Sequence, residues 1–370
     1  MRLYLFFMTE LVSSVPQRPR LNNIQALRGL AAFLVMLSHL FIIEQKYSQD
    51  TILSSLLNFG MAGVDIFFVI SGFIMVYVTH KWSRSAAKHI PKFLFARAGR
   101  IYPLYWVVSF ALLVVYLLKP DWVFSASIWN EPHLLKSFLL WPHRSYPLLE
   151  VGWTLIHEMS FYLIFACILI SPRRWRPMLI SLWAAIVVGG YMMGLSAYGP
   201  VFKILFHPLS LEFCGGALMG YWLLTPQRRS GAWPFLIAGV VLFMASIFAF
   251  VIIGNNAPDM GWMRVGTFGV SAFIILLAAI LFEQDGKSAP NWSIVLGDWS
   301  YALYLTHVLS LSLMGRLWAR FDQVGIWDNL IMLPLCLIGS IIVAGLTHKI
   351  IEAPMMRASK HVQKKIFKSN

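Results

Sequence analysis

Ten apolar runs follow one another along the chain, and each is about 20 residues long, the length that a helix needs to cross the hydrocarbon core of a bilayer. They span residues 23–44, 57–79, 101–118, 152–171, 177–195, 206–224, 233–254, 265–282, 293–315 and 329–348. Charged residues make up only 12% of the sequence, whereas soluble domains carry about 25%. The pattern excludes a soluble enzyme and predicts an all-α polytopic membrane protein with about ten transmembrane helices.

The gaps between these runs differ in their content of basic residues. Of the 30 lysines and arginines, 21 lie in one alternating set of gaps and 8 in the other, and Arg28 lies inside the first run. Since Lys and Arg are retained on the cytoplasmic side of a membrane, this distribution predicts that both termini are cytoplasmic. The net charge of +14 is therefore interpreted as a topology signal and not as a nucleic-acid binding surface.

The same runs define the organisation of the chain. Residues 1–22 are expected to form a cytoplasmic N-terminal segment, 23–350 the transmembrane domain and 351–370 a basic cytoplasmic tail. The longest external loop, 119–151, contains three tryptophans, and it either covers the outer mouth of a site or lies on the membrane surface, anchored by tryptophan. The three cysteines have neither the spacing of a disulfide framework nor that of a metal site.

Several ionisable residues interrupt the apolar runs, where each costs at least about 2.5–3.5 kcal/mol. Arg28 and His39 share one face of the first helix, because eleven steps of about 100° end within about 20° of a whole number of turns. Asp65 and Glu158 reach a depth similar to that of His39, so we expect these side chains to converge in the outer half of the bundle. A carboxylate beside the imidazole would raise its basicity, as a general base requires. The alternative is an ion-pair lattice that only holds helices together.

Arg97 and Arg100 precede the third run on its cytoplasmic side, and they lie three residues apart on one helix face. Two guanidinium groups in this arrangement form a phosphate clamp, and Arg28 opens nearby. Basic residues at this membrane edge also serve as topology determinants that contact anionic lipid. Glu352 follows the last run, and we expect it either to pair with one of these arginines or to remain in water.

The ninth run carries a polar stripe, because Ser300, Tyr301, Tyr304 and His307 recur at helical spacing. We expect this stripe to face the interior of the bundle and His307 to line the same cavity as His39. The alternative is a set of interhelical hydrogen bonds that only joins helices.

Together these motifs resemble the membrane acyltransferase-3 family, which acylates extracytoplasmic carbohydrates in bacteria. The resemblance covers essentially the whole chain, and it is strongest to the stand-alone, exopolysaccharide-modifying members. It rests on the Arg28 to His39 spacing, Gly63-Val-Asp65-Ile-Phe-Phe-Val-Ile-Ser71-Gly-Phe, Arg97-Ala-Gly-Arg100, the Trp153 to Tyr162 segment with Glu158, and Ser300-Tyr-Ala-Leu-Tyr304-Leu-Thr-His307. His157 departs from the family pattern by adding a second imidazole, and Glu212 stays unassigned.

The resemblance implies transfer of an acyl group, usually acetyl, from cytoplasmic acyl-coenzyme A to a hydroxyl of an exopolysaccharide or another surface carbohydrate. The acceptor would be a polymer or a lipid-linked sugar. The resemblance also implies a multi-pass protein of the bacterial cytoplasmic membrane. We expect contacts with membrane lipid, but no permanently bound cofactor, no metal and no nucleic acid.

Roles for individual residues follow from the same resemblance. The coenzyme phosphates are expected on three arginines, Arg28, Arg97 and Arg100. His39, oriented by Asp65 or Glu158, would either deprotonate the sugar hydroxyl or itself be acylated. The expected substrate-binding residues are Ser71, Tyr304 and His307.

Two other function classes compete with this one. A transporter or channel would use the same intramembrane charges as a proton relay, and a non-catalytic membrane component of polysaccharide assembly would need them only for folding. The phosphate clamp at the cytoplasmic side favours the enzyme, and binding of coenzyme A by the purified protein distinguishes the classes.

The charge distribution makes a testable prediction about topology. A reporter joined after Arg176 is expected to be cytoplasmic and one placed near Trp129 external, because Arg176 lies in the set of gaps that holds 21 basic residues. Fusions to alkaline phosphatase and to a fluorescent protein measure the two locations. Both reporters on one side of the membrane would contradict the ten-helix topology.

Overall fold

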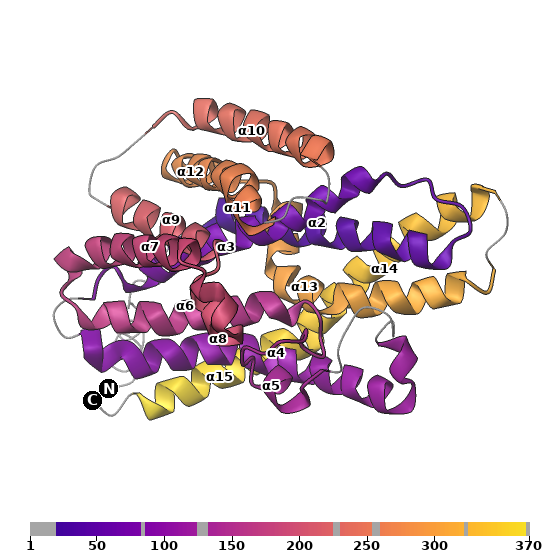
Figure 1. The fold of residues 1–370 in the computed structure, drawn as a ribbon, viewed down its shortest axis with the longest axis horizontal. Helices are drawn as coiled ribbons and strands as arrows, with labels where there is room; N and C mark the ends of the chain where they lie inside the picture. Colours follow the sequence, from indigo (N-terminus) through magenta and orange to yellow (C-terminus); the bar gives the residue numbers. More distant parts are fainter. Residues whose placement is uncertain are drawn as a thin grey trace, which may run out of the picture.

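The computed structural model describes residues 20–82, 86–123, 132–224, 230–253, 260–321 and 325–367. In these ranges the chain is helical and contains no strand, and most of the long helices run roughly along the long axis of the molecule (Figure 1). Within the same ranges, nine helices are long and apolar enough to cross a membrane. The prediction of an all-α polytopic membrane protein is confirmed.

Each predicted run corresponds to a long helix in the described part of the chain. In chain order these are α2 (Asn22–Tyr47), α3 (Ala62–Thr79), α4 (Ile90–Leu118), α6 (Gly152–Ile170), α7 (Arg176–Met192), α9 (Ser210–Leu223), α10 (Ala232–Ile253), α12 (Val270–Gln284), α13 (Asn291–Trp318) and α14 (Trp327–Thr347). Shorter helices extend three of them: a 3-10 helix (Ser55–Met61) precedes α3, α8 (Pro200–Leu205) precedes α9, and α11 (Met260–Arg264) with a π-helix (Val265–Gly269) precedes α12.

α13 is 28 residues long, but it is too polar to be one of the nine helices that could cross a membrane by length and hydropathy. Its polar stripe explains this, because Ser300 and His307 are fully buried and Thr306 is only 7% exposed. These polar residues face neighbouring helices and not lipid. α13 packs along α2 near the centre of the bundle (Figure 1). The ten predicted runs are therefore nine apolar helices and this polar one, and the cytoplasmic placement of both termini remains a prediction.

α4 begins earlier than the apolar run at 101–118 indicated. The helix starts at Ile90, because basic residues lower the hydropathy without breaking a helix. Its first turns pack against α15 (Ala353–Ile366), where Gln363 Nε2 donates a hydrogen bond of 2.8 Å to the Lys92 carbonyl. The expected basic tail is thus a helix that continues α14 through a π-helix (His348–Glu352). Residues 1–19 of the expected N-terminal segment lie outside the described residues.

The described part of the long external loop packs against α4. Three aromatic side chains of α4 donate hydrogen bonds to backbone carbonyls in and just after α5 (Leu134–Phe138): Tyr102 to Leu139, Tyr105 to Ser137 and Trp106 to Phe138, at 2.9, 2.7 and 2.9 Å. Irregular backbone at membrane depth is tolerated where protein covers it. Trp129, the proposed reporter site, lies outside the described residues.

Glycines allow α3 and α9 to approach closely. A Cβ atom at Gly72 would overlap the backbone oxygen of Phe213, and one at Gly216 would overlap the backbone oxygen of Val69. Small residues permit this kind of backbone contact between membrane helices. The contact fixes the register of two helices that each carry a buried carboxyl group.

This packing predicts the effect of adding one methyl group. Gly216→Ala is expected to lower stability by roughly 1–3 kcal/mol, because the added Cβ must displace the α3 backbone. Gly189→Ala in α7 is the matched control: nothing lies within 4 Å of its Cβ position, so this change should stabilise by about 0.5–1 kcal/mol through helix propensity. Thermal unfolding of both variants in detergent measures the difference, and equal effects would contradict the close contact.

Candidate active site

A cavity of about 570 Å³ enters the bundle between α2, α3, α4, α6 and α13. The exposed side chains of Arg20 and Lys360 lie at its entrance. The buried side chains of Thr154 and Tyr304 lie at its inner end. We call the entrance the basic end; the charge distribution predicts that it is cytoplasmic. Six of the predicted site residues line this cavity: Arg28, Ser71, Arg97, Arg100, Glu158 and Tyr304.

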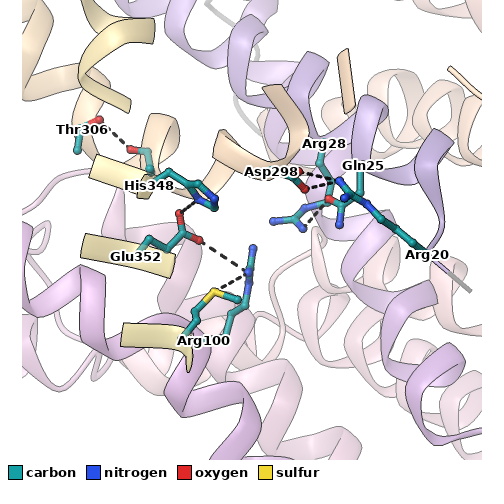
Figure 2. A network of polar contacts seen from close by, with 10 residues as sticks. Arg20, Gln25, Arg28, Arg100, Asp298, Thr306, His348 and Glu352 are labelled. Carbon is teal, nitrogen blue, oxygen red and sulfur yellow. Dashed lines mark hydrogen bonds and ion pairs between the residues drawn. The ribbon is translucent and has the colours of Figure 1, made fainter. Parts of the chain in front are cut away.

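Three guanidinium groups converge near the basic end. The charges of Arg28 and Arg100 repel each other across the cavity, and both side chains are directed into the same space (Figure 2). Arg97 Cζ lies 5.8 Å from the ring centroid of Phe93 and 5.9 Å from that of Tyr162, and among the described residues its Nε has no hydrogen-bond partner. Like charges held this close are stabilised by an anion with several oxygen atoms, such as a phosphate.

Arg100 is held from its other side by Glu352, whose carboxylate is buried. Glu352 Oε1 lies 3.8 Å from Arg100 Nη1, and Glu352 Oε2 lies 2.8 Å from His348 Nδ1 (Figure 2). Of the two alternatives expected for Glu352, the structure shows the pairing with an arginine and not a carboxylate in water. An adjoining hollow of about 600 Å³ shares Arg28, Arg100 and Lys360 with the cavity and adds two more cations around the same entrance, Lys349 and Arg357.

Glu158 lies in this cavity among hydroxyl groups. Its Oε1 accepts a hydrogen bond of 3.1 Å from Ser71 Oγ and a short one from the Tyr162 hydroxyl. The sequence placed Glu158 at the depth of His39, but the structure turns its carboxylate toward the arginine-lined part of the cavity. Both of its hydrogen-bond donors in the described structure are hydroxyls and neither is an imidazole.

His39 and His307, which were expected to line one cavity, contact each other. Their rings meet edge to face with centroids 4.8 Å apart. His39 Nδ1 lies 2.9 Å from the Val35 carbonyl oxygen and His307 Nδ1 lies 3.0 Å from that of Leu303. Because a carbonyl only accepts, each Nδ1 carries the proton, and a neutral ring then leaves Nε2 with a free lone pair. His307 Nε2 is buried and has no hydrogen-bond partner among the described residues.

A pair of hydroxyls lies between the cavity and the two imidazoles. Thr154 Oγ1 and the Tyr304 hydroxyl are 2.8 Å apart, and both side chains line the inner end of the cavity. The Tyr304 ring also lies 5.9 Å from that of His307. Neither His39 nor His307 lines the cavity, so in this conformation the hydroxyl pair forms its end.

Asp65 pairs with a residue that the sequence did not single out. Its Oδ2 accepts a hydrogen bond of 2.6 Å from Arg264 Nη2, and the Asp65 side chain is fully buried. We predicted that Asp65 would orient His39, but this hydrogen bond directs it to α11. The sequence did not indicate Arg264 as a site residue, because it precedes the apolar run at 265–282 and was counted in an external gap. In the structure the helical segment begins earlier, at Met260, so that Arg264 lies within it.

A second pair of imidazoles lies on the α6 side of the bundle. The rings of His157 and His207 meet edge to face with centroids 4.7 Å apart, and Trp153 packs on His157 with its centroid at 5.7 Å. The sequence indicated no role for His157 and did not single out His207. In the part of the chain that the structure describes, no group of three or more His, Cys, Asp or Glu side chains is placed to hold a metal ion.

Three comparisons relate the chain to known proteins. A family model described as an acyltransferase domain matches residues 21–349. Exopolysaccharide production protein ExoZ of Rhizobium meliloti (strain 1021) is 32% identical over 269 residues, which cover 70% of this chain and 78% of that protein. Nodulation protein 10 of Rhizobium leguminosarum bv. viciae is 28% identical, with 91% and 93% covered. Acyltransferase MdmB of Streptomyces mycarofaciens is 26% identical, with 92% and 93% covered. No solved structure matches the chain.

The ion pair between Asp65 and Arg264 predicts a stability effect. Arg264→Met is expected to destabilise the protein by roughly 3–5 kcal/mol, because it leaves a buried carboxylate without its counter-charge. Adding Asp65→Asn removes that charge and should recover most of the loss. Thermal unfolding in detergent compares the two variants. A double variant that is as unstable as Arg264→Met alone would show that the lost charge pairing is not the cause.

Proposed function

The chain belongs to the acyltransferase-3 family, and from this premise we propose that it is a membrane O-acyltransferase that uses cytoplasmic acyl-coenzyme A. The acyl group, acetyl in this proposal, moves to a hydroxyl of an exopolysaccharide or another surface carbohydrate. The similarity to an exopolysaccharide production protein supports a carbohydrate acceptor. The excess of basic residues at one membrane face and the bacterial relatives support a place in a bacterial cytoplasmic membrane.

The cavity is the observation that carries this proposal. Coenzyme A is an anion with several phosphates and a thin pantetheine arm, and the cavity combines three arginines near its entrance with a narrow interior lined by aromatic and hydroxyl side chains. In the proposal, Arg28, Arg97 and Arg100 bind the phosphates, because guanidinium groups form paired charge-assisted hydrogen bonds to them. The cations of the adjoining hollow enlarge the anion-binding surface at the same entrance.

The reaction itself is placed at the far end of the cavity. Transfer breaks the thioester C–S bond, forms an ester C–O bond and moves the hydroxyl proton to the departing thiolate. His39 Nε2 is suited to this proton transfer because its Nδ1–H is fixed on the Val35 carbonyl. A transient acyl-imidazole would form at the same Nε2 atom, so both routes depend on this one group.

The remaining site residues act around this centre in the proposal. Tyr304 and His307 bind substrate next to His39, since the three rings form one continuous contact. Ser71 binds the donor arm through the hydroxyl that it presents to Glu158. Glu158 contributes as the carboxylate nearest the donor, and Asp65 contributes by holding Arg264 at the α3 surface.

Donor binding and chemistry can be separated by mutation. Arg97→Ala and Arg100→Ala each remove charge-assisted contacts of roughly 1.5–3 kcal/mol, which corresponds to an affinity for acyl-coenzyme A weaker by about ten- to a hundred-fold. His39→Ala should bind the donor nearly as well as wild type but transfer no acyl group. A binding titration with purified variants measures the first effect, and mass spectrometry of the surface polysaccharide measures the second.

The matched control for the arginines is Arg174→Ala, because Arg174 is exposed, lies over the Trp175 ring and does not line the cavity. Lysine at position 97 or 100 should restore affinity only in part, since it keeps the charge but loses the bidentate fork. Equal donor affinity in wild type and in Arg97→Ala with Arg100→Ala would refute the phosphate site. Full acylation of the polysaccharide by folded His39→Ala would refute the catalytic assignment.

A further inference from the structure

Two buried glutamates in the structure differ in the number of donors they receive. Glu44 is fully buried, and its carboxylate accepts hydrogen bonds from the backbone N–H groups of Ile52 and Leu53 at 3.0 and 2.9 Å and from Asn329 Nδ2 at 2.7 Å. Three donors stabilise the ionised form of a carboxyl group. Both carboxyl oxygens of Glu44 therefore have donors from other parts of the chain.

Glu212 has no such donors. Its side chain is 4% exposed, and neither of its carboxyl oxygens has a donor among the described residues. It faces Asp65, whose carboxyl group lies within hydrogen-bonding reach. Asp65 Oδ1 also lacks a donor, while Asp65 Oδ2 is bonded to Arg264.

The backbone is built to accommodate the Glu212 carboxyl group at this place. Gly269 ends the π-helix that follows Arg264, and a Cβ atom there would lie 2.8 Å from Glu212 Oε1. The close contact of α3 with α9 through Gly72 and Gly216 holds the two carboxyl groups together from the other side. Neither carboxyl group has room to turn toward solvent.

Two ionised carboxylates cannot share this position. Both only accept hydrogen bonds, so they would repel each other at contact distance in a medium of low dielectric constant. Arg264 supplies a single positive charge, which leaves one negative charge uncompensated. The imidazoles of His157 and His207 and the hydroxyl of Tyr304 also interact with the charge of Arg264, and none of the three has a hydrogen bond to Glu212 in the described structure.

We propose that Glu212 and Asp65 bind one proton between them, carried by Glu212 and donated to Asp65 Oδ1. The proton gives Asp65 Oδ1 a donor and gives one of the two Glu212 oxygens a hydrogen-bond partner. It also leaves the cluster of Glu212, Asp65 and Arg264 electrically neutral, as its place inside the membrane requires. A protonated carboxylic acid that donates to its neighbour is the arrangement found where two acids share one site. The contacts that support this proton site do not depend on the proposed acyl transfer.

Infrared difference spectroscopy of the purified full-length protein tests the proposal. The carbonyl stretch of a protonated carboxylic acid is separate from the amide bands and shifts in D₂O. We expect this band to be lost in Glu212→Gln, whose amide can still donate to Asp65. We expect it to be lost also in Asp65→Asn, because the carboxyl group of Glu212 then ionises beside Arg264.

Glu44→Gln is the matched control: it removes a buried carboxyl group whose oxygens already accept three hydrogen bonds, so the acid band should keep its full intensity. A band that persists in Glu212→Gln overturns the proposal. A wild-type protein without this band, whose unfolding temperature depends on sodium or potassium, also overturns it, because a metal cation and not a proton would then lie between the two carboxylates.

Discussion

The close packing of α2 against α13 is the contact on which the rest of the candidate site depends. A Cβ atom at Gly29 would lie 2.8 Å from the backbone nitrogen of Gly297, so glycine lets the two helices approach at the basic end. Further along, the same pair of helices brings His39 and His307 together with ring centroids 4.8 Å apart. Arg28 and His39 lie on one face of α2. They can form a site together only because α13 packs opposite that face.

Three buried carboxyl groups in the described residues have partners on another helix or loop. Asp65 of α3 pairs with Arg264 of α11, Glu352 pairs with Arg100 of α4, and Glu44 receives backbone donors from the loop after α2. Since an uncompensated charge inside a membrane is expensive, these pairs also fix how the helices are rotated about their axes. The arginines of the cavity differ from these pairs, because Arg28 and Arg100 lie close enough for their charges to repel each other. An excess of one charge sign around an open space is typical of a ligand site.

Hydropathy predicted the helices well because a membrane demands about 20 apolar residues per crossing. Hydropathy placed the start of α4 too late in the sequence, and it made α13 the least apolar of the ten predicted helices. The reason is the same for both helices, because each carries polar residues of the candidate site. An expected depth could be inferred from the sequence for His39, Asp65 and Glu158, which were placed in one layer. Their partners could not, because depth along a helix says nothing about which neighbour a side chain faces. Glu158 turned out to bond Ser71 and Tyr162, while Asp65 bonds Arg264. Only the rotation of each helix, set by glycine contacts and by charge pairs, decides between such partners.

The hydroxyl pair of Thr154 and Tyr304 lies at the inner end of the cavity, between the proposed donor site and the two imidazoles. The cavity from the basic end stops at this pair, and the imidazoles lie beyond it. A donor from one side and a carbohydrate from the other would have to meet at His39 without opening a continuous path. A thin acyl arm that displaces one hydroxyl from the other satisfies this requirement, because the arm itself then fills the gap. In the proposed mechanism the donor arm therefore has to pass this hydroxyl pair, whose oxygens are 2.8 Å apart, before its thioester can reach His39.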